Sequence, residues 1–143
     1  MKRLPGLRDL SEDHHHGLVL ARKAKRTGAG EPGPSAGEVW SEVEMQFSTE
    51  LAPHFLIEET HLAPGLEAAG ETALAKRLFE EHQALRSFLQ PGSGRSLDDL
   101  ARFGELLERH IRFEEQELFE VAQRRLSLEA LAAVAQACRA NTA

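Results

Sequence analysis

The segment His110-Ile-Arg-Phe-Glu-Glu-Gln-Glu-Leu-Phe-Glu120 places an imidazole and a carboxylate four residues apart within a helical pattern of apolar residues. Positions i and i+4 lie on one face of an α-helix, so His110 and Glu114 could bind one ion from a single helix. Leu106 and Leu107 mark the same side of this helix as the side that faces a core. The segment therefore predicts a helix with metal-ligating groups on its buried face.

A close copy of this pattern lies upstream. The segment His54-Phe-Leu-Ile-Glu-Glu-Thr-His-Leu62 aligns with residues 110–118, and both contain His-x-x-x-Glu-Glu-x-x-Leu. An ionised carboxylate on a core-facing stripe is costly unless it is paired or coordinates a cation. Apart from Arg86, no basic residue lies on these stripes, so a pair of metal ions is expected to supply the charge. Glu58 and Glu114 would bridge the two ions, and histidines would bind at the outer positions.

Composition indicates one compact, acidic domain. The 143 residues, 41% of them hydrophobic, suit a single domain over residues 1–143 with one core. The formal net charge of -6 disfavours nucleic acid and anionic membrane surfaces as partners, because both require a basic face. The single cysteine, Cys138, suits a reducing compartment, and no apolar run is long enough to span a bilayer. We therefore expect a cytoplasmic protein.

Helix formers and helix caps recur along the chain, whereas strand signals are nearly absent. The expected N-terminal caps are Ser11, Ser35, Ser96 and Ser127. The second and third of these have an acidic residue three positions later, as in a capping box. Pro53 is expected to kink or restart the second helix, and Pro64 to end it. The predicted long helices cover about residues 11–26, 35–62, 71–90 and 96–125.

Four long helices with short connections imply antiparallel neighbours. We therefore predict an all-α fold: an up-down-up-down four-helix bundle over about residues 10–125, with a short C-terminal fifth helix over about residues 127–140. The two His-x-x-x-Glu-Glu segments fall on the second and fourth helices of this bundle.

The first and third helices supply further histidines. His82 falls on the apolar stripe of the third helix. On the first helix, helical phase favours His14, which shares a face with Leu10 and Leu18. Comparison with the segment around His82 instead favours His15, because each of these two histidines has a leucine three residues later. Both first-helix histidines remain candidate ligands.

The type of metal follows from the chemistry of the candidate ligands. They are His14, His15, His54, Glu58, His82, His110 and Glu114. Four imidazoles and two carboxylates without a thiolate suit iron or manganese better than structural zinc, whose closed sites favour four ligands rich in cysteine. Six side chains are too many for one zinc ion, and they suit two irons that also hold solvent or a small ligand.

These motifs resemble those of the hemerythrin-like, or HHE cation-binding, family. The resemblance covers about residues 10–122 and rests on the two His-x-x-x-Glu-Glu segments, on Glu81-His82-Gln-Ala-Leu85 and on the His-rich segment from Asp13 to Leu18. It implies a non-haem di-iron centre inside a four-helix bundle. The implied terminal ligands are His54, His82, His110 and one histidine of the first helix, with Glu58 and Glu114 as bridges.

One departure from the family pattern bears on function. Oxygen-carrying members have two ligand histidines four residues apart on the third helix, whereas Arg86 follows His82 here, so the resemblance implies an open iron position. We expect a di-iron protein that binds, senses or reduces oxygen, nitric oxide or peroxide. A catalytic version would need a route for electrons, which the sequence does not show. The alternatives are iron-centre repair and iron storage or buffering, although only residues 58–61 have the Glu-x-x-His form of ferritin-like bundles.

Overall fold

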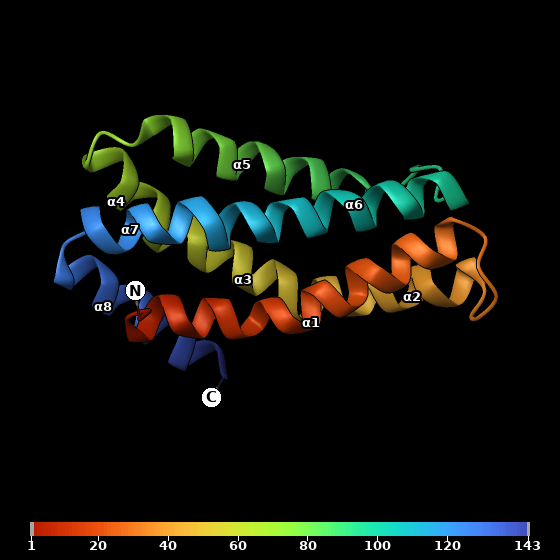
Figure 1. Cartoon of the computed structure of the whole chain (residues 1–143), viewed down its shortest axis with the longest axis horizontal. Helices are drawn as coiled ribbons and strands as arrows, with labels where there is room; N and C mark the ends of the chain where they lie inside the picture. Colours follow the sequence, from red (N-terminus) through yellow and green to blue (C-terminus); the bar gives the residue numbers. More distant parts are fainter. Residues whose placement is uncertain (1, 143) are drawn as a thin grey trace.

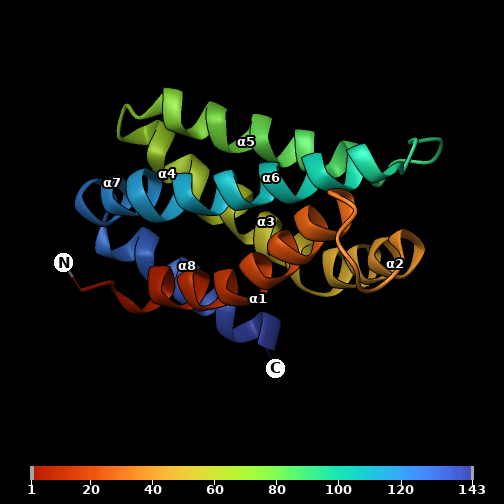
Figure 2. The ribbon, with the colours of Figure 1, turned by 45° about the vertical axis from the view of Figure 1, so that its right-hand side comes forward.

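The computed structural model describes residues 2–142, and every regular element within that range is a helix. Four long helical segments run side by side in alternating directions, and a fifth helix packs across one end of the bundle (Figure 1). Figure 2 shows from a second direction that this fifth helix lies against the first. The predicted all-α, up-down-up-down bundle with a C-terminal helix is confirmed. No helix within residues 2–142 is both long enough and apolar enough to cross a lipid bilayer.

Helix α1 spans Pro5–Gly28 and begins earlier than predicted. Proline occupies its first turn, where a missing backbone N–H breaks no helical hydrogen bond, and Leu7 and Leu10 are fully buried. Ser11 therefore lies inside the helix, and its hydroxyl donates to Glu115 Oε2 at 2.7 Å. The predicted cap at Ser11 is wrong, because burial of the preceding leucines extends the helix toward the N-terminus.

The second long segment is continuous but alternates between α-helical and π-helical turns. Its parts are α2 (Ala36–Gln46), η1 (Phe47–Leu51), α3 (Ala52–Ile57), η2 (Glu58–Leu62) and α4 (Ala63–Ala68), where η marks π-helix. The predicted capping box at its start is present, with Glu38 N–H donating to Ser35 Oγ at 3.2 Å.

This segment does not end at Leu62, as predicted, but continues to Ala68. Both prolines that were expected to interrupt it follow a π turn: Pro53 lies two residues after η1, and Pro64 lies two residues after η2. In an ordinary α-helix, proline clashes with the carbonyl four residues earlier. That carbonyl belongs here to the wider π turn, which makes room for the ring, so the helix passes through both prolines.

The remaining helices follow the predicted boundaries more closely. Helix α5 spans Thr72–Ser87, and the fourth segment joins α6 (Leu97–Phe113), η3 (Glu114–Leu118) and α7 (Phe119–Arg125). The capping box that opens α6 and the end of α7 are as predicted. Helix α8 spans Leu128–Thr142, with Ser127 Oγ accepting from Ala130 N–H at 3.0 Å. The predicted cap at Ser127 is therefore confirmed.

A polar layer divides the core into two apolar clusters. One cluster includes Leu10 and Phe119, and the other includes Leu20 and Phe103. On each of the four long segments, a buried histidine lies between residues of one cluster and residues of the other. The bundle therefore places four imidazoles at one level of its interior.

Helices α1 and α6 approach each other closely through two glycines. A Cβ added at Gly104 would lie 2.5 Å from the Ala21 carbonyl oxygen, and one added at Gly28 would lie 2.5 Å from the Ala101 amide nitrogen. Both contacts are to backbone atoms, which cannot move without separating the helices. Because these helices carry two of the interior histidines, their separation also sets the width of the polar layer.

We expect Gly104→Ala to destabilise the protein by about 1–3 kcal/mol, because the added methyl group would push α1 and α6 apart. Gly37→Ala is the matched control, since nothing lies within 4 Å of its added Cβ. Alanine is the better helix former, so this control should gain roughly 0.4–1 kcal/mol. Urea unfolding followed by circular dichroism measures both values. Equal stability of the two variants would contradict the close packing of α1 on α6.

Candidate metal centre

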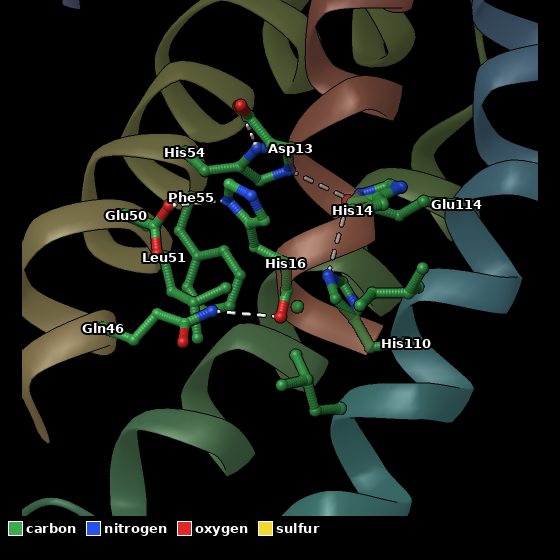
Figure 3. Close-up of a pocket in the computed structure, with 13 residues that line it drawn as sticks. Asp13, His14, His16, Gln46, Glu50, Leu51, His54, Phe55, His110 and Glu114 are labelled. Carbon is green, nitrogen blue, oxygen red and sulfur yellow. Dashed lines mark hydrogen bonds and ion pairs between the residues drawn. The ribbon is translucent and has the colours of Figure 1, made fainter. Parts of the chain in front are cut away.

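Four histidines and two glutamates converge in the polar layer. They are His14 of α1, His54 of α3, Glu58 of η2, His82 of α5, His110 of α6 and Glu114 of η3. All six are buried, and the most exposed of them, His14, is only 6% exposed. Figure 3 shows part of this cluster, with His14, His54, His110 and Glu114 lying close together between α1, α3 and α6.

The six side chains form two overlapping groups. His14 and His54 form one group with the two glutamates, and His82 and His110 form the other with the same two glutamates. Within each group the ligand atoms all lie within 4.8 Å of one another. Two ions could therefore be held side by side, each by two imidazoles and both by the shared glutamates.

Both shared glutamates are the first residues of π turns. The backbone carbonyl of Glu58 accepts from the N–H of Ala63, and that of Glu114 accepts from the N–H of Phe119, five residues later in each case. Buried positions recur here every four residues, as in His110, Glu114 and Leu118. In an α-helix, this spacing rotates each position by about 40° from the previous one. A π turn holds more residues per turn and so keeps the series directed toward the core. Strict four-residue spacing is the sequence signal that could have revealed these turns.

Several buried polar atoms of the cluster make no hydrogen bond to any described residue and only face one another, imidazole nitrogen to carboxylate oxygen, at 3.1 to 3.3 Å. They are Nε2 of His54, His82 and His110, both carboxylate oxygens of Glu58, and Oε2 of Glu114. Unpartnered buried polar atoms are costly and rare in native proteins. A cation between these atoms would satisfy imidazole nitrogens and carboxylate oxygens together. The residues present therefore fit a metal, and nitrogen and oxygen donors without sulfur suit iron or manganese.

Each interior histidine also donates from Nδ1 to a carboxylate outside the cluster. The pairs are His14 with Glu115 at 2.7 Å, His54 with Asp13 at 3.1 Å, His82 with Glu59 at 2.6 Å and His110 with Glu81 at 2.7 Å. We call these four acids the outer carboxylates. They favour the proton on Nδ1 and leave Nε2 to face the centre of the cluster, as at many metal sites.

The outer carboxylates are not among the site residues predicted from the sequence. Each is nevertheless adjacent in the chain to a member of the cluster: Asp13 precedes His14, Glu81 precedes His82, and the other two follow the shared glutamates. The repeated acid-His and Glu-Glu pairs were therefore the available signal. The sequence does not show that each of these acids contacts a histidine on a different helix.

Of the two first-helix candidates, only His14 lies in the cluster. His15 is exposed, and its ring centroid lies 5.8 Å from that of the exposed His16. The comparison that favoured His15 is wrong about which ring points inward, because a leucine three residues later does not fix the buried face, whereas helical phase does. His61 is half-buried and belongs to neither ligand group.

The buried charges strongly shift the titration of the metal-free cluster. Burial lowers the pKa of His110, but the negative charge of Glu114 and hydrogen bonds to carboxylates outweigh it and raise this pKa from 6.5 to about 10. At His14 and His54, burial is likewise outweighed by carboxylates, and the pKa of each is raised. Burial raises the pKa of Glu114, but the charge of His110 and several hydrogen bonds bring it well below its ordinary value.

A small hollow opens beside the cluster (Figure 3). The exposed residues His16 and Glu50 line it together with the buried residues Leu51, Phe55 and Ile111. Its volume of about 10 Å³ is close to the smallest that can hold one water molecule. The hollow therefore has room for about one water-sized molecule and none for an organic substrate.

The fold and the cluster define a four-helix-bundle protein with a buried metal-binding site of imidazoles and carboxylates. A model of the hemerythrin HHE cation-binding domain family matches residues 5–122. The chain belongs to this family, and the resemblance noted in the sequence is confirmed. No curated protein and no solved structure gave a significant match. Helix α8 lies beyond the matched residues.

Because His110 holds a proton at neutral pH in the metal-free protein, metal binding must release that proton. We expect metal affinity to rise with pH up to about 10, the pKa above which His110 no longer holds this proton. The metal-free protein should show the opposite trend, since a raised folded-state pKa stabilises fully below 6.5 and this stabilisation is lost toward about 10. Metal titrations and thermal melts measure the two trends. An affinity independent of pH would contradict proton displacement.

Proposed function

We propose that this chain is a non-haem di-iron protein that binds, senses or reduces a small ligand, namely oxygen, nitric oxide or peroxide. The strongest support is the pair of overlapping ligand groups that share Glu58 and Glu114. Sharing two carboxylates allows six interior side chains to hold two ions in adjoining positions. Membership of a cation-binding family supports the same function.

Iron suits the donor set better than other metals. Two imidazoles with carboxylate oxygens and open positions are typical of non-haem ferrous sites. Each position offers two imidazole nitrogens and an oxygen from each of the two glutamates, which leaves about two positions of an octahedral ion for solvent or a ligand. When bound, an iron pair supplies electrons and Lewis acidity to such a ligand.

The surroundings of His82 support an open position. Arg86, which replaces a histidine of the oxygen carriers, turns to Glu59, with Nη1 2.8 Å from Oε2. The Phe55 ring stacks on His82 with the ring centroids 3.8 Å apart, so apolar carbon covers this face of the imidazole. No further imidazole of residues 2–142 enters either ligand group. This arrangement favours reaction with a small ligand over simple carriage.

One observation disfavours the alternative of iron storage. His61, which completes the Glu-x-x-His segment, lies outside both ligand groups. The segment therefore does not act as the ligand pair that ferritin-like bundles use.

Metal content and the optical spectrum of protein purified from iron-replete cells test the proposed function. We expect roughly two irons per chain, because the two ligand groups share both carboxylates, and the oxidised protein should show the charge-transfer bands of an oxo-bridged pair. Addition of oxygen, nitric oxide or hydrogen peroxide to the reduced protein should then change these bands, and the response to only one of them would identify the ligand. A colourless, metal-free and fully folded protein would overturn the proposal.

Removal of a shared carboxylate should release both ions. We expect Glu114→Ala to lose most of its iron, because Glu114 contributes to both ligand groups. Glu105→Ala is the matched control, since Glu105 lies on the same long helical segment but is exposed and belongs to neither ligand group. Iron analysis of the purified variants measures the difference. Loss of only one ion from Glu114→Ala would show that this residue binds a single position.

A further inference from the structure

Three of the four outer carboxylates are themselves bound by an arginine. Arg3 pairs with Glu115, Arg77 with Glu81 and Arg86 with Glu59. Each arginine also lies over a phenylalanine ring: Phe119 at 5.6 Å, Phe113 at 3.9 Å and Phe55 at 5.6 Å from the centroid, respectively. Each of these rings in turn lies beside the histidine that the same carboxylate contacts.

The surroundings of His82 show how such an arrangement fixes an imidazole. Its Nδ1 donates to Glu59 Oε2 at 2.6 Å, and Arg86 reaches both oxygens of that carboxylate, at 2.8 and 3.1 Å. The Phe55 ring stacks on the face of the imidazole. A guanidinium binds a carboxylate through two N–H groups and stacks on aromatic faces. Arg86 therefore restrains both groups that restrain the ring.

The contact between His54 and its outer carboxylate lacks the restraint that Arg3, Arg77 and Arg86 give to the other three contacts. Its outer carboxylate, Asp13, lies 3.1 Å away, whereas the other three contacts measure 2.6 to 2.7 Å. The Asp13 side chain is 56% exposed, compared with 13%, 26% and 34% for Glu59, Glu81 and Glu115. The three arginines that bind the other outer carboxylates, Arg3, Arg77 and Arg86, pair with those acids and not with Asp13. Water competes more strongly for an exposed pair of this kind.

Asp13 also borders two hollows. It lines the small hollow beside the cluster, where Figure 3 shows it next to His54, and a second cavity of about 180 Å³. The second cavity is lined by Asp9 and Glu12, whose negative charges repel that of Asp13, and by Arg139, whose positive charge attracts it. The Asp13 carboxylate therefore borders open space on two sides, whereas His54 borders only the small hollow.

We propose that the two metal positions hold their ions unequally, a proposal that rests on the di-iron function above. The position bound by His14 and His54 releases its ion first, because one of its two imidazoles is held only by an exposed aspartate. The Asp13 contact with His54 controls the rate of this release.

The position bound by His82 and His110 retains its ion longer. Both of its imidazoles are held by carboxylates that an arginine restrains. Arg77 and Arg86 are positioning residues for this ion, since each acts on it through a carboxylate and a histidine. Outer contacts of this kind contribute about 10–100-fold to metal affinity.

Release of iron to ferrozine, a chelator that absorbs when it takes up ferrous iron, tests this inequality. Protein loaded with ferrous iron under nitrogen should lose its ions in two resolved steps. Asp13→Asn should speed the first step about tenfold and leave the second unchanged. Arg86→Gln should speed the second step by about the same factor and leave the first unchanged.

Two further variants separate positioning from general loosening. Arg112→Gln is the matched control, because Arg112 pairs with Glu108 at 2.6 Å and contacts no outer carboxylate, so neither step should change. Arg86→Lys should restore part of the retention, since lysine keeps the charge but lacks the planar fork. A loosened fold would instead speed both steps and lower the melting temperature of the metal-free protein, and this result for Arg86→Gln would overturn its role as a positioning residue.

Iron content measured before release distinguishes failure of this inference from failure of the proposed function. A folded protein that takes up no iron pair overturns the di-iron function itself. Full loading followed by release of both ions in a single step would overturn only the inequality. If Asp13→Asn instead accelerated the second step, Asp13 would act on the ion that is released second, and the assignment proposed above would be wrong.

Discussion

Two carboxylates without any solvent exposure, Glu58 and Glu114, impose the constraint on which the rest of the structure depends. Charges at that depth require compensation, and within the described chain only imidazoles lie close enough to provide it. Without metal, protons on His54 and His110, whose pKa values are raised, compensate this charge, and bound cations would replace those protons. The polar layer interrupts the apolar core on all four long segments, where leucine would pack without such costs. The interior is therefore specialised for binding at the expense of stability.

The outer carboxylates join the four segments in a closed cycle. The first segment supplies an acid to the second, the second to the third, the third to the fourth, and the fourth to the first. Rotation of any one helix about its axis would break two contacts, the one it gives and the one it receives. The first and third segments each supply an acid that precedes a cluster histidine in the chain, and the second and fourth each supply an acid that follows a shared glutamate. The cycle therefore has the same twofold repeat as the duplicated sequence motif. Asp13 breaks this repeat, since it is shorter and more exposed than its counterpart Glu81.

Local signals made much of this structure predictable. The capping boxes span four residues each, and the apolar periodicity gives the number and direction of the long helices. The duplicated motif likewise indicates four of the six residues that meet in the polar layer, and helical periodicity indicates the other two, His14 and His82. The start of α1 and the passage of the helix through Pro64 depend instead on packing against distant residues and on π turns, which α-helical periodicity does not describe. The partners of the outer carboxylates lie on other helices, so no local pattern could show them.

The π turns let each of the two segments hold one more residue at the centre than an α-helix would. Deleting one residue from η3 would restore ordinary α-helical winding and leave Leu118 and Phe119 facing the core, because seven residues of α-helix turn through about 700°, close to two full turns from His110. The same deletion in an α-helical part of the segment would instead rotate everything beyond it by about 100°. A related chain that is one residue shorter at η2 or η3 would therefore keep this core, whereas one shortened elsewhere in the segment would not.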